Sequence, residues 1–314
     1  MYSVVIPVYR NEDSLIDLIA ALGDVNRTLD GALEAVFVID GSPDQSYTKL
    51  RSALPAAPFA SQLVLLSRNF GSFAAIRCGL QAARGQNFAV LAADLQEPPE
   101  LVVEFFRRLD AGTADVVVGT RESRNDPLLS RAFSQLFWAL YRRLINPEIP
   151  SGGVDVFGCN REFRDQLLAL DERHSSLIGL LFWLGFRRET LSYARRPRKH
   201  GKSAWTLRRK INYMLDSIFA FSDLPVRLLL FVGVAGMGVA ALFGTIVLVL
   251  RLIGQLHVPG YAATITAIVF FGGLNALGLG IIGAYVWRAY ANTQHRPLAV
   301  VMRSESFPAG EAHS

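Results

Sequence analysis

The residues best suited to chemistry form one short acidic segment, Ala92–Glu100, with the sequence AADLQEPPE. An apolar run precedes it, so the Asp94 carboxylate leaves what we expect to be a buried strand. Carboxylate and amide oxygens are ligands for Mg²⁺ or Mn²⁺, and proteins often share these ions with substrate phosphates. Acidic side chains are also typical of a helix N-terminus, where they face the positive end of the helix dipole. Residue types alone favour neither interpretation, a metal site or a helix N-terminus, over the other.

The elements that must position this segment alternate between strand and helix. Short apolar runs predict strands over Ser3–Val8, Glu34–Ile39, Gln62–Leu66, Asn87–Ala92, Ala114–Val118 and Gly152–Val156. Helical spacing predicts helices over Glu12–Leu22, Ser72–Ala83, Pro98–Leu109, Ser130–Ile145 and Arg161–Leu170. This order predicts an α/β fold with a mostly parallel, doubly wound, Rossmann-like sheet. Such sheets bind ligands beyond the carboxyl ends of their strands, which is where the acidic segment falls.

Two uncharged runs, Leu228–Leu250 and Val258–Trp287, follow the α/β part. Each exceeds the roughly 20 helical residues that cross a bilayer core of about 30 Å. A buried core helix is the alternative, but two such runs in tandem are hard to bury in a chain of 314 residues. Cationic residues flank the pair on its outer sides: Arg208, Arg209, Lys210, Arg227, Arg288, Arg296 and Arg303. We therefore expect a multi-pass protein of the plasma (inner) membrane whose large α/β domain is cytoplasmic.

The segment Thr206–Phe221 repeats apolar residues at helical spacing and carries its charges elsewhere on the helix. A basic amphipathic helix beside a span is expected at the membrane interface, and a helix packed on the protein core is the alternative. The chain is thus predicted to have four parts. They are an α/β domain over 1–205, an interface helix over 206–222, a two-helix membrane anchor over 226–290 and a flexible cytosolic tail over 291–314.

Seven segments, in order, resemble the family 2 polyprenyl-phosphate glycosyltransferases of GT-A fold: VVIPVYRNED, VIDGSPD, LSRNFGSFAAIRCGL, AADLQEPPE, GTRESRNDP, GGVD and RKHGKS. That family includes dolichyl-phosphate mannose synthases and bacterial undecaprenyl-phosphate glucosyl- and aminoarabinosyl-transferases. The resemblance spans roughly residues 3 to 230, and the two apolar runs match the bacterial membrane-anchored branch. It implies sugar transfer from a nucleotide-sugar, UDP-glucose-like, to polyprenyl phosphate, with Mg²⁺ or Mn²⁺ as cofactor. The resemblance further implies that the product serves cell-envelope glycan modification.

The resemblance also implies roles for individual residues. Asp94 and Gln96 would bind the metal and the diphosphate, and Asp155 would lie where donor and acceptor meet. Residues implied to bind the donor nucleotide and its phosphates are Pro7, Tyr9, Glu12, Asp40, Arg68, Asn69, Gly71, Arg121, Arg124, Arg198 and Ser203. The last two belong to a loop that the family closes on the diphosphate.

Three positions depart from the family pattern, since Ala92, Ile39 and Ala204 stand where acids or a lysine are usual. The loss at Ala92 leaves Asp94 as the single carboxylate of a usual pair. These departures motivate an alternative, a catalytically impaired relative that acts as a lipid-binding membrane scaffold. A processive polysaccharide synthase is disfavoured, because the chain has no Gln-x-x-Arg-Trp motif.

The expected acceptor determines the expected mechanism. A lipid phosphate is already anionic at neutral pH, so attack needs no strong general base. We therefore expect a single displacement with inversion at the anomeric carbon, in which Asp155 orients or balances charge. The expected partners are a nucleotide-sugar, polyprenyl phosphate and the membrane, with no nucleic acid. Small residues at Ala276, Gly280 and Ala284 allow close helix packing, within the hairpin or in a homo-oligomer such as a tetramer.

Overall fold

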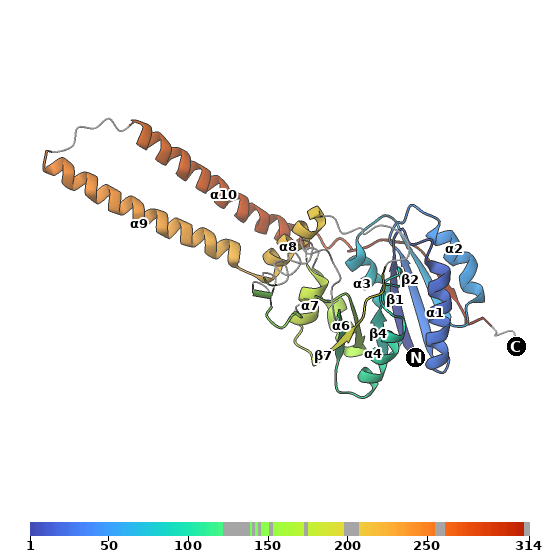
Figure 1. Ribbon diagram of the computed structural model, residues 1–314. Coiled ribbons are helices and arrows are strands. Elements are labelled where there is room, and N and C mark those ends of the chain that lie inside the picture. The colour runs from blue at the N-terminus through green and yellow to red at the C-terminus, as the bar shows by residue number, and fades with distance from the viewer. Residues whose placement is uncertain are drawn as a thin grey trace.

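The structure is a computed structural model that describes residues 1–121, 139, 142–143, 146–150, 153–172, 175–197, 207–254 and 261–310. Three predicted site residues, Arg124, Arg198 and Ser203, lie outside the described residues, as does most of the predicted helix 130–145. The described part comprises an α/β body and a long pair of helices that projects from it (Figure 1).

The body is built on one eight-stranded sheet in the order β7-β5-β6-β4-β1-β2-β3-β8. The strands are β1 (Tyr2–Val8), β2 (Leu33–Ile39), β3 (Ala60–Leu66), β4 (Asn87–Val90), β5 (Val116–Arg121), β6 (Val156–Asn160), β7 (Arg188–Tyr193) and β8 (Val301–Phe307). Strands β1 to β4 pair in parallel, and so do β5 and β7. Strands β6 and β8 run antiparallel to their neighbours. The prediction of a mostly parallel sheet is therefore confirmed.

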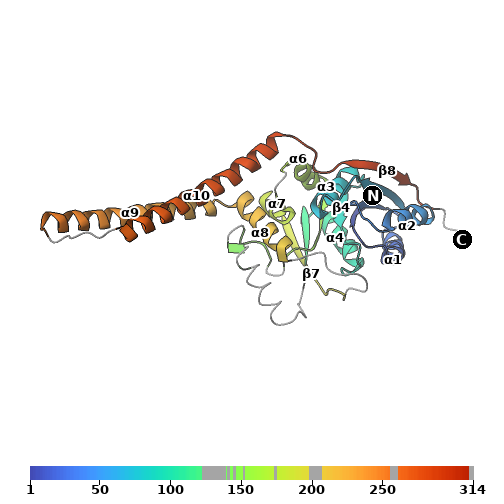
Figure 2. The ribbon, with the colours of Figure 1, turned by 90° about the horizontal axis from the view of Figure 1, so that it is seen from above.

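Helices cover both faces of the sheet, which explains why β2 is buried along its whole length. One face packs against α1 (Leu15–Thr28), α2 (Ser46–Ala53) and α4 (Glu100–Asp110). The other packs against α3 (Ser72–Ala82), α6 (Arg161–Ala169) and α7 (Leu177–Trp183). The view from above separates the two groups of helices (Figure 2).

Two expectations about the later strands are wrong. The strand predicted over residues 152–156 begins instead at Val156, because Gly153 takes a φ of 76° and interrupts the extended backbone. The tail predicted to be flexible over 291–314 instead contributes β8, which pairs with β3 from Ser61 to Leu66. Its sequence, VMRSESF, lacks the apolar run of a central strand because it is an exposed edge strand.

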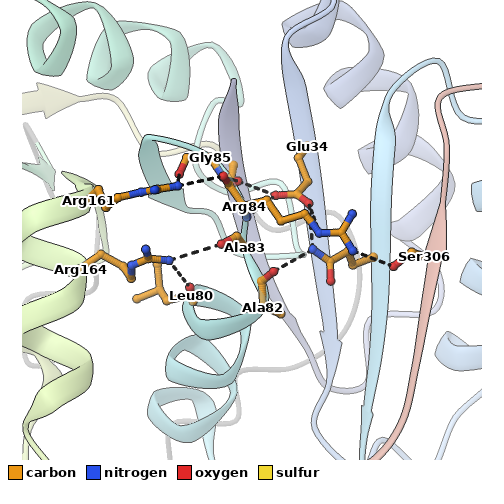
Figure 3. Close-up of polar contacts among 11 residues, drawn as sticks. Glu34, Leu80, Ala82, Ala83, Arg84, Gly85, Arg161, Arg164 and Ser306 are labelled. Atoms are coloured by element: carbon orange, nitrogen blue, oxygen red, sulfur yellow. Dashed lines mark hydrogen bonds and ion pairs between the residues drawn. The ribbon is translucent and has the colours of Figure 1, made fainter.

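The amino end of the sheet is held by a buried polar network around Glu34, shown in Figure 3. The Glu34 carboxylate accepts hydrogen bonds from Ser3 Oγ at 2.6 Å, Gln62 Nε2 at 2.8 Å and the Arg84 amide at 2.8 Å. Arg161 donates to the Arg84 and Gly85 carbonyls. The Glu34 carboxylate thus links β1, β2, β3 and the end of α3. This network lies at the amino edge of the sheet, opposite the carboxyl edge.

The body is joined to the projecting helices through α8 (Leu207–Phe221), which precedes α9 (Leu224–Leu252) and α10 (Tyr261–Thr293). Asp216 of α8 pairs with Arg288 of α10 at 2.7 Å, and Tyr285 donates to the Ser222 carbonyl at 3.3 Å. Gly179 of α7 leaves room for the ring of Phe221. Helix α8 is thus fixed between the body and α10.

Helices α9 and α10 are long, apolar and almost entirely unburied. At 1.5 Å per residue, the 29 residues of α9 span about 44 Å, more than a bilayer core. Their contact passes Gly278, which lies against Leu229, and Gly236, which lies against Phe271. Gly280, by contrast, has open space around it. A core helix of a soluble protein would be buried, so that alternative does not describe these two helices.

Candidate active site

A tight turn at the end of β4 carries the acidic segment. Leu95 takes a φ of 56°, a left-handed conformation that costs a residue with a Cβ about 1 kcal/mol or more and tends to occur at functional sites. The turn lets the Gln96 amide donate to Asp94 Oδ1 at 3.3 Å. Ser14 at the start of α1 donates to the Ala93 carbonyl at 2.7 Å. Asp94 and Gln96 therefore lie on one anchored turn at the carboxyl edge of the sheet.

Asp155 reaches the same edge because β6 is antiparallel to β4 and β5. It directly precedes β6, so it lies beside the carboxyl ends of the neighbouring strands. Arg121 at the end of β5 binds both Asp155 oxygens, through Nε and through Nη2 at 2.8 Å. Tyr193 at the end of β7 donates to Asp155 Oδ2 at 3.1 Å. Burial, with the charges of Asp155 and Glu97, raises the pKa of Tyr193, so it remains a donor at neutral pH.

Arg121 and Asp155 thus form a bidentate ion pair, the Arg121–Asp155 fork. Glu97 and Arg195 form a second ion pair beside it. Arg195 Nε lies 3.4 Å from Glu97 Oε1, and Arg195 Nη2 donates to Gln96 Oε1 at 2.7 Å. The Glu97 side chain is only 2% exposed. Burial raises the pKa of Glu97 to about 7; Arg195 opposes the shift, and the nearby Asp94 and Asp155 add to it. The edge therefore concentrates three carboxyl groups and two guanidinium groups.

Asp40, at the end of β2, organises the segment that follows β3. Its carboxylate accepts from the Phe70 amide at 2.7 Å and the Gly71 amide at 2.9 Å, at the start of α3. Burial raises the pKa of Asp40, although these amides and Arg68 stabilise its charged form. Gly41 is required here, because a Cβ would come within 2.2 Å of the Arg68 carbonyl carbon. The predicted donor residues Arg68, Asn69 and Gly71 are thus brought to the end of β2.

The loop after β1 completes this side of the edge. Glu12 accepts from the Gln45 amide at 2.9 Å, and its own amide donates to Asp44 at 3.2 Å. Pro7 and Tyr9 are half-buried at the end of the same strand. The loops after β1 and β2 are therefore fastened to each other, and the loop after β1, which carries Tyr9, is next to the Asp94 turn in the order of the sheet.

The structure brings the described site candidates to one edge of the sheet. In the order of the strands, this edge runs from Arg68, Asn69 and Gly71 through Asp40, Pro7, Tyr9 and Glu12 to Asp94, Gln96, Asp155 and Arg121. The sequence interpretation missed three further residues there, namely Glu97, Tyr193 and Arg195. Glu97 was visible in the acidic segment, whereas nothing in the sequence singled out Tyr193 or Arg195.

The residues of the Leu95 turn suit a hard divalent cation. Asp94 supplies a carboxylate and Gln96 an amide oxygen, which are ligands that Mg²⁺ and Mn²⁺ accept. Across the described residues, no three His, Cys, Asp or Glu side chains group so as to hold a metal. Mg²⁺ is usually bound through one or two carboxylates together with water and substrate phosphates, so a turn that offers one carboxylate is compatible with it.

Comparison with known proteins shows the family of the chain. The profile of the family described as "Glycosyl transferase family 2" matches residues 3–169, which include the turn and both members of the Arg121–Asp155 fork. The chain belongs to glycosyltransferase family 2. Its parallel sheet with antiparallel β6, covered by helices on both faces, is the GT-A-like arrangement that the sequence resemblance implied.

Several relatives match this family 2 glycosyltransferase over nearly its whole length. An undecaprenyl-phosphate 4-deoxy-4-formamido-L-arabinose transferase of Pseudomonas paraeruginosa is 35% identical, covering 96% of this chain and 90% of its own. An uncharacterised glycosyltransferase of Synechocystis is 33% identical, covering 95% and 94%. A bactoprenol glucosyl transferase of Shigella phage SfV is 28% identical, covering 95% and 97%. The similarity therefore extends through α9 and α10.

Proposed function

We propose that this glycosyltransferase transfers one sugar from a nucleotide-sugar to the phosphate of a polyprenyl lipid, with undecaprenyl phosphate the favoured acceptor. The observation that carries the acceptor is a contrast between two relatives. Their names give different sugars, glucose and an aminoarabinose derivative, but both give a polyprenyl acceptor. Both relatives align with more than nine-tenths of this chain, so we assign it the feature that they share, the polyprenyl acceptor. UDP-glucose is the first donor to test.

The arrangement at the carboxyl edge supports an inverting single displacement. The lipid phosphate attacks as an anion, so the site needs to position the reactants and balance charge. Arg121 is suited to this because its guanidinium fork matches phosphate and carboxylate oxygens. Asp155, held by Arg121 and Tyr193, would orient the reacting groups rather than remove a proton.

Asp94 and Gln96 would hold a divalent cation, which supplies positive charge for the departing diphosphate when bound. The loops after β1 and β2, with Pro7, Tyr9, Glu12 and Asp40, would line the nucleotide. The segment Arg68–Gly71 would lie beside them, near the donor. The nucleotide would thus occupy one half of the edge, and the sugar would reach towards Asp155 in the other half.

Helices α9 and α10 would place this site at the cytoplasmic face of the plasma membrane. Their large side chains are exposed, with Phe231 at 72% and Leu279 at 70%. An apolar surface of this extent requires a partner, and two adjacent helices of spanning length suit a bilayer. Helix α8, locked by Asp216 and Arg288, would lie at the interface where lipid phosphates are found.

The test is a transfer assay with the full-length protein in nanodiscs that contain undecaprenyl phosphate. UDP-, GDP- and dTDP-sugars with a radiolabelled sugar are supplied with Mg²⁺ or Mn²⁺, and the lipid fraction is analysed. We expect one donor to yield a lipid-phosphate-linked sugar, with no product from dephosphorylated undecaprenol. A folded protein that gives no product with any donor, but still binds undecaprenyl phosphate, would establish the scaffold alternative.

A further inference from the structure

Arg195 makes an unexpected contact with the turn that carries the proposed metal ligands. Its Nη2 donates to Gln96 Oε1 at 2.7 Å, and its Nε lies 3.4 Å from Glu97 Oε1. A guanidinium has only donors, so the amide oxygen of Gln96 must face it. The Gln96 Nε2 correspondingly donates to the Arg196 carbonyl at 3.5 Å. Arg195 therefore holds the one Gln96 side-chain atom that a cation would need.

The backbone keeps Arg195 in this position. The Arg196 amide donates to the Gln96 carbonyl at 2.8 Å, so the chain leaving β7 is fastened to the Leu95 turn. Beneath the contact, Glu97 is buried, and its Oε2 has no hydrogen-bond partner among the described residues. Glu97 is thus placed to retain Arg195 even if Gln96 turns away.

A guanidinium and a divalent cation on the same oxygen would repel each other strongly in a half-buried site. We propose that Arg195 and the divalent cation compete for Gln96 Oε1. Without metal, Arg195 occupies the amide oxygen; when the metal binds, Gln96 is transferred to it. Arg195 then remains on Glu97 with its Nη2 donor available to the donor's diphosphate. This last step rests on the proposed function, whereas the competition does not.

The competition predicts that removing Arg195 strengthens metal binding. Mn²⁺ alone is titrated into the full-length protein, and free Mn²⁺ is followed by electron paramagnetic resonance without nucleotide or lipid. We expect Arg195→Ala to bind Mn²⁺ roughly tenfold more tightly than the unaltered protein. Equal affinity in the two proteins, or no binding in either, would overturn the proposal, whatever the transfer assay shows.

Two further variants separate competition from a general loss of positive charge. Arg196→Ala removes the same charge one residue later, from an exposed side chain that faces Glu100 at 3.3 Å, and should leave Mn²⁺ affinity nearly unchanged. In a Gln96→Ala background, Arg195→Ala should no longer tighten binding, because the contested oxygen is gone. A gain that persists in that background would contradict competition through Gln96. If Arg195→Ala fails to fold by circular dichroism, Arg195→Gln replaces it in every comparison.

Discussion

Arg121 and Asp155 form a two-pronged ion pair across β5 and β6, with 2.8 Å between Nη2 and Oδ1. A second fork joins Arg187 to Asp115, with Nη2 at 2.8 Å and Nε at 3.0 Å from its oxygens. Asp115 and Arg187 precede β5 and β7, so that fork lies at the amino edge of the same sheet. These two forks have similar geometry, and the Arg121–Asp155 fork lies in the proposed site.

These two forks allow a matched test of Arg121. Arg121→Lys keeps the charge but cannot bind both Asp155 oxygens, and we expect kcat to fall about tenfold or more. Arg187→Lys makes the same change at the opposite edge and should leave kcat within about twofold. Both are measured in the nanodisc transfer assay. Equal losses in the two variants would show that the Arg121 fork matters only for folding.

Removing the Asp155 carboxylate should also slow the reaction. We expect Asp155→Ala to lower kcat by roughly two orders of magnitude, because Arg121 and Tyr193 lose the group that orients them. Initial rates at saturating donor and lipid measure this. An unchanged rate would remove Asp155 from the reaction centre.

The carboxylate of Asp94 is expected to be essential for transfer. Asp94→Asn keeps the shape of the turn but removes the charge that would bind the cation, so activity should fall by about two to three orders of magnitude. Glu100→Gln, six residues later and exposed, serves as the control and should retain activity. Circular dichroism and membrane insertion should be normal in both. Near-normal activity of Asp94→Asn would place the metal site elsewhere.

The Glu34 network should determine stability and not catalysis. Glu34→Ala leaves the buried Ser3 and Gln62 side chains without their hydrogen-bond acceptor, which should lower the free energy of unfolding by about 2–4 kcal/mol. Asp24→Ala, which breaks an exposed pair with Arg27, should cost about 0.5 kcal/mol or less. Thermal unfolding of the detergent-purified proteins measures the difference. A similar melting temperature for both variants would contradict the role assigned to Glu34.

The C-terminal strand should protect the edge of the sheet. Truncation before Val301 would leave β3 with unpaired backbone groups, which are prone to edge-to-edge association. We expect the truncated protein to aggregate on size-exclusion chromatography. In the full-length protein, trypsin should cleave slowly at Arg303, since the strand must first detach from β3. Rapid cleavage there would indicate that the tail is mobile after all.

Patterns of a few residues were sufficient to predict much of this protein. The apolar runs that became β1 to β5 and the long uncharged runs of α9 and α10 are local signals, because burial on both faces or exposure to lipid requires continuous apolar sequence. The position of Asp94 after a strand likewise placed it at the carboxyl edge. Local sequence is thus sufficient to predict an element when its surroundings, a buried core or lipid, require a particular pattern of residues.

The sequence by itself therefore determined the α/β order, the two apolar helices and the acidic turn. Only the tertiary structure decided that β6 runs antiparallel, which brings Asp155 to Arg121, and that the polar segment 301–307 pairs with β3. It also decided that Arg195 meets Gln96, 99 residues away in the chain. The physical reason is that these contacts join residues far apart in the chain. They form only where the folded backbone brings the two segments side by side, and the spacing of residues within one segment does not specify its partner.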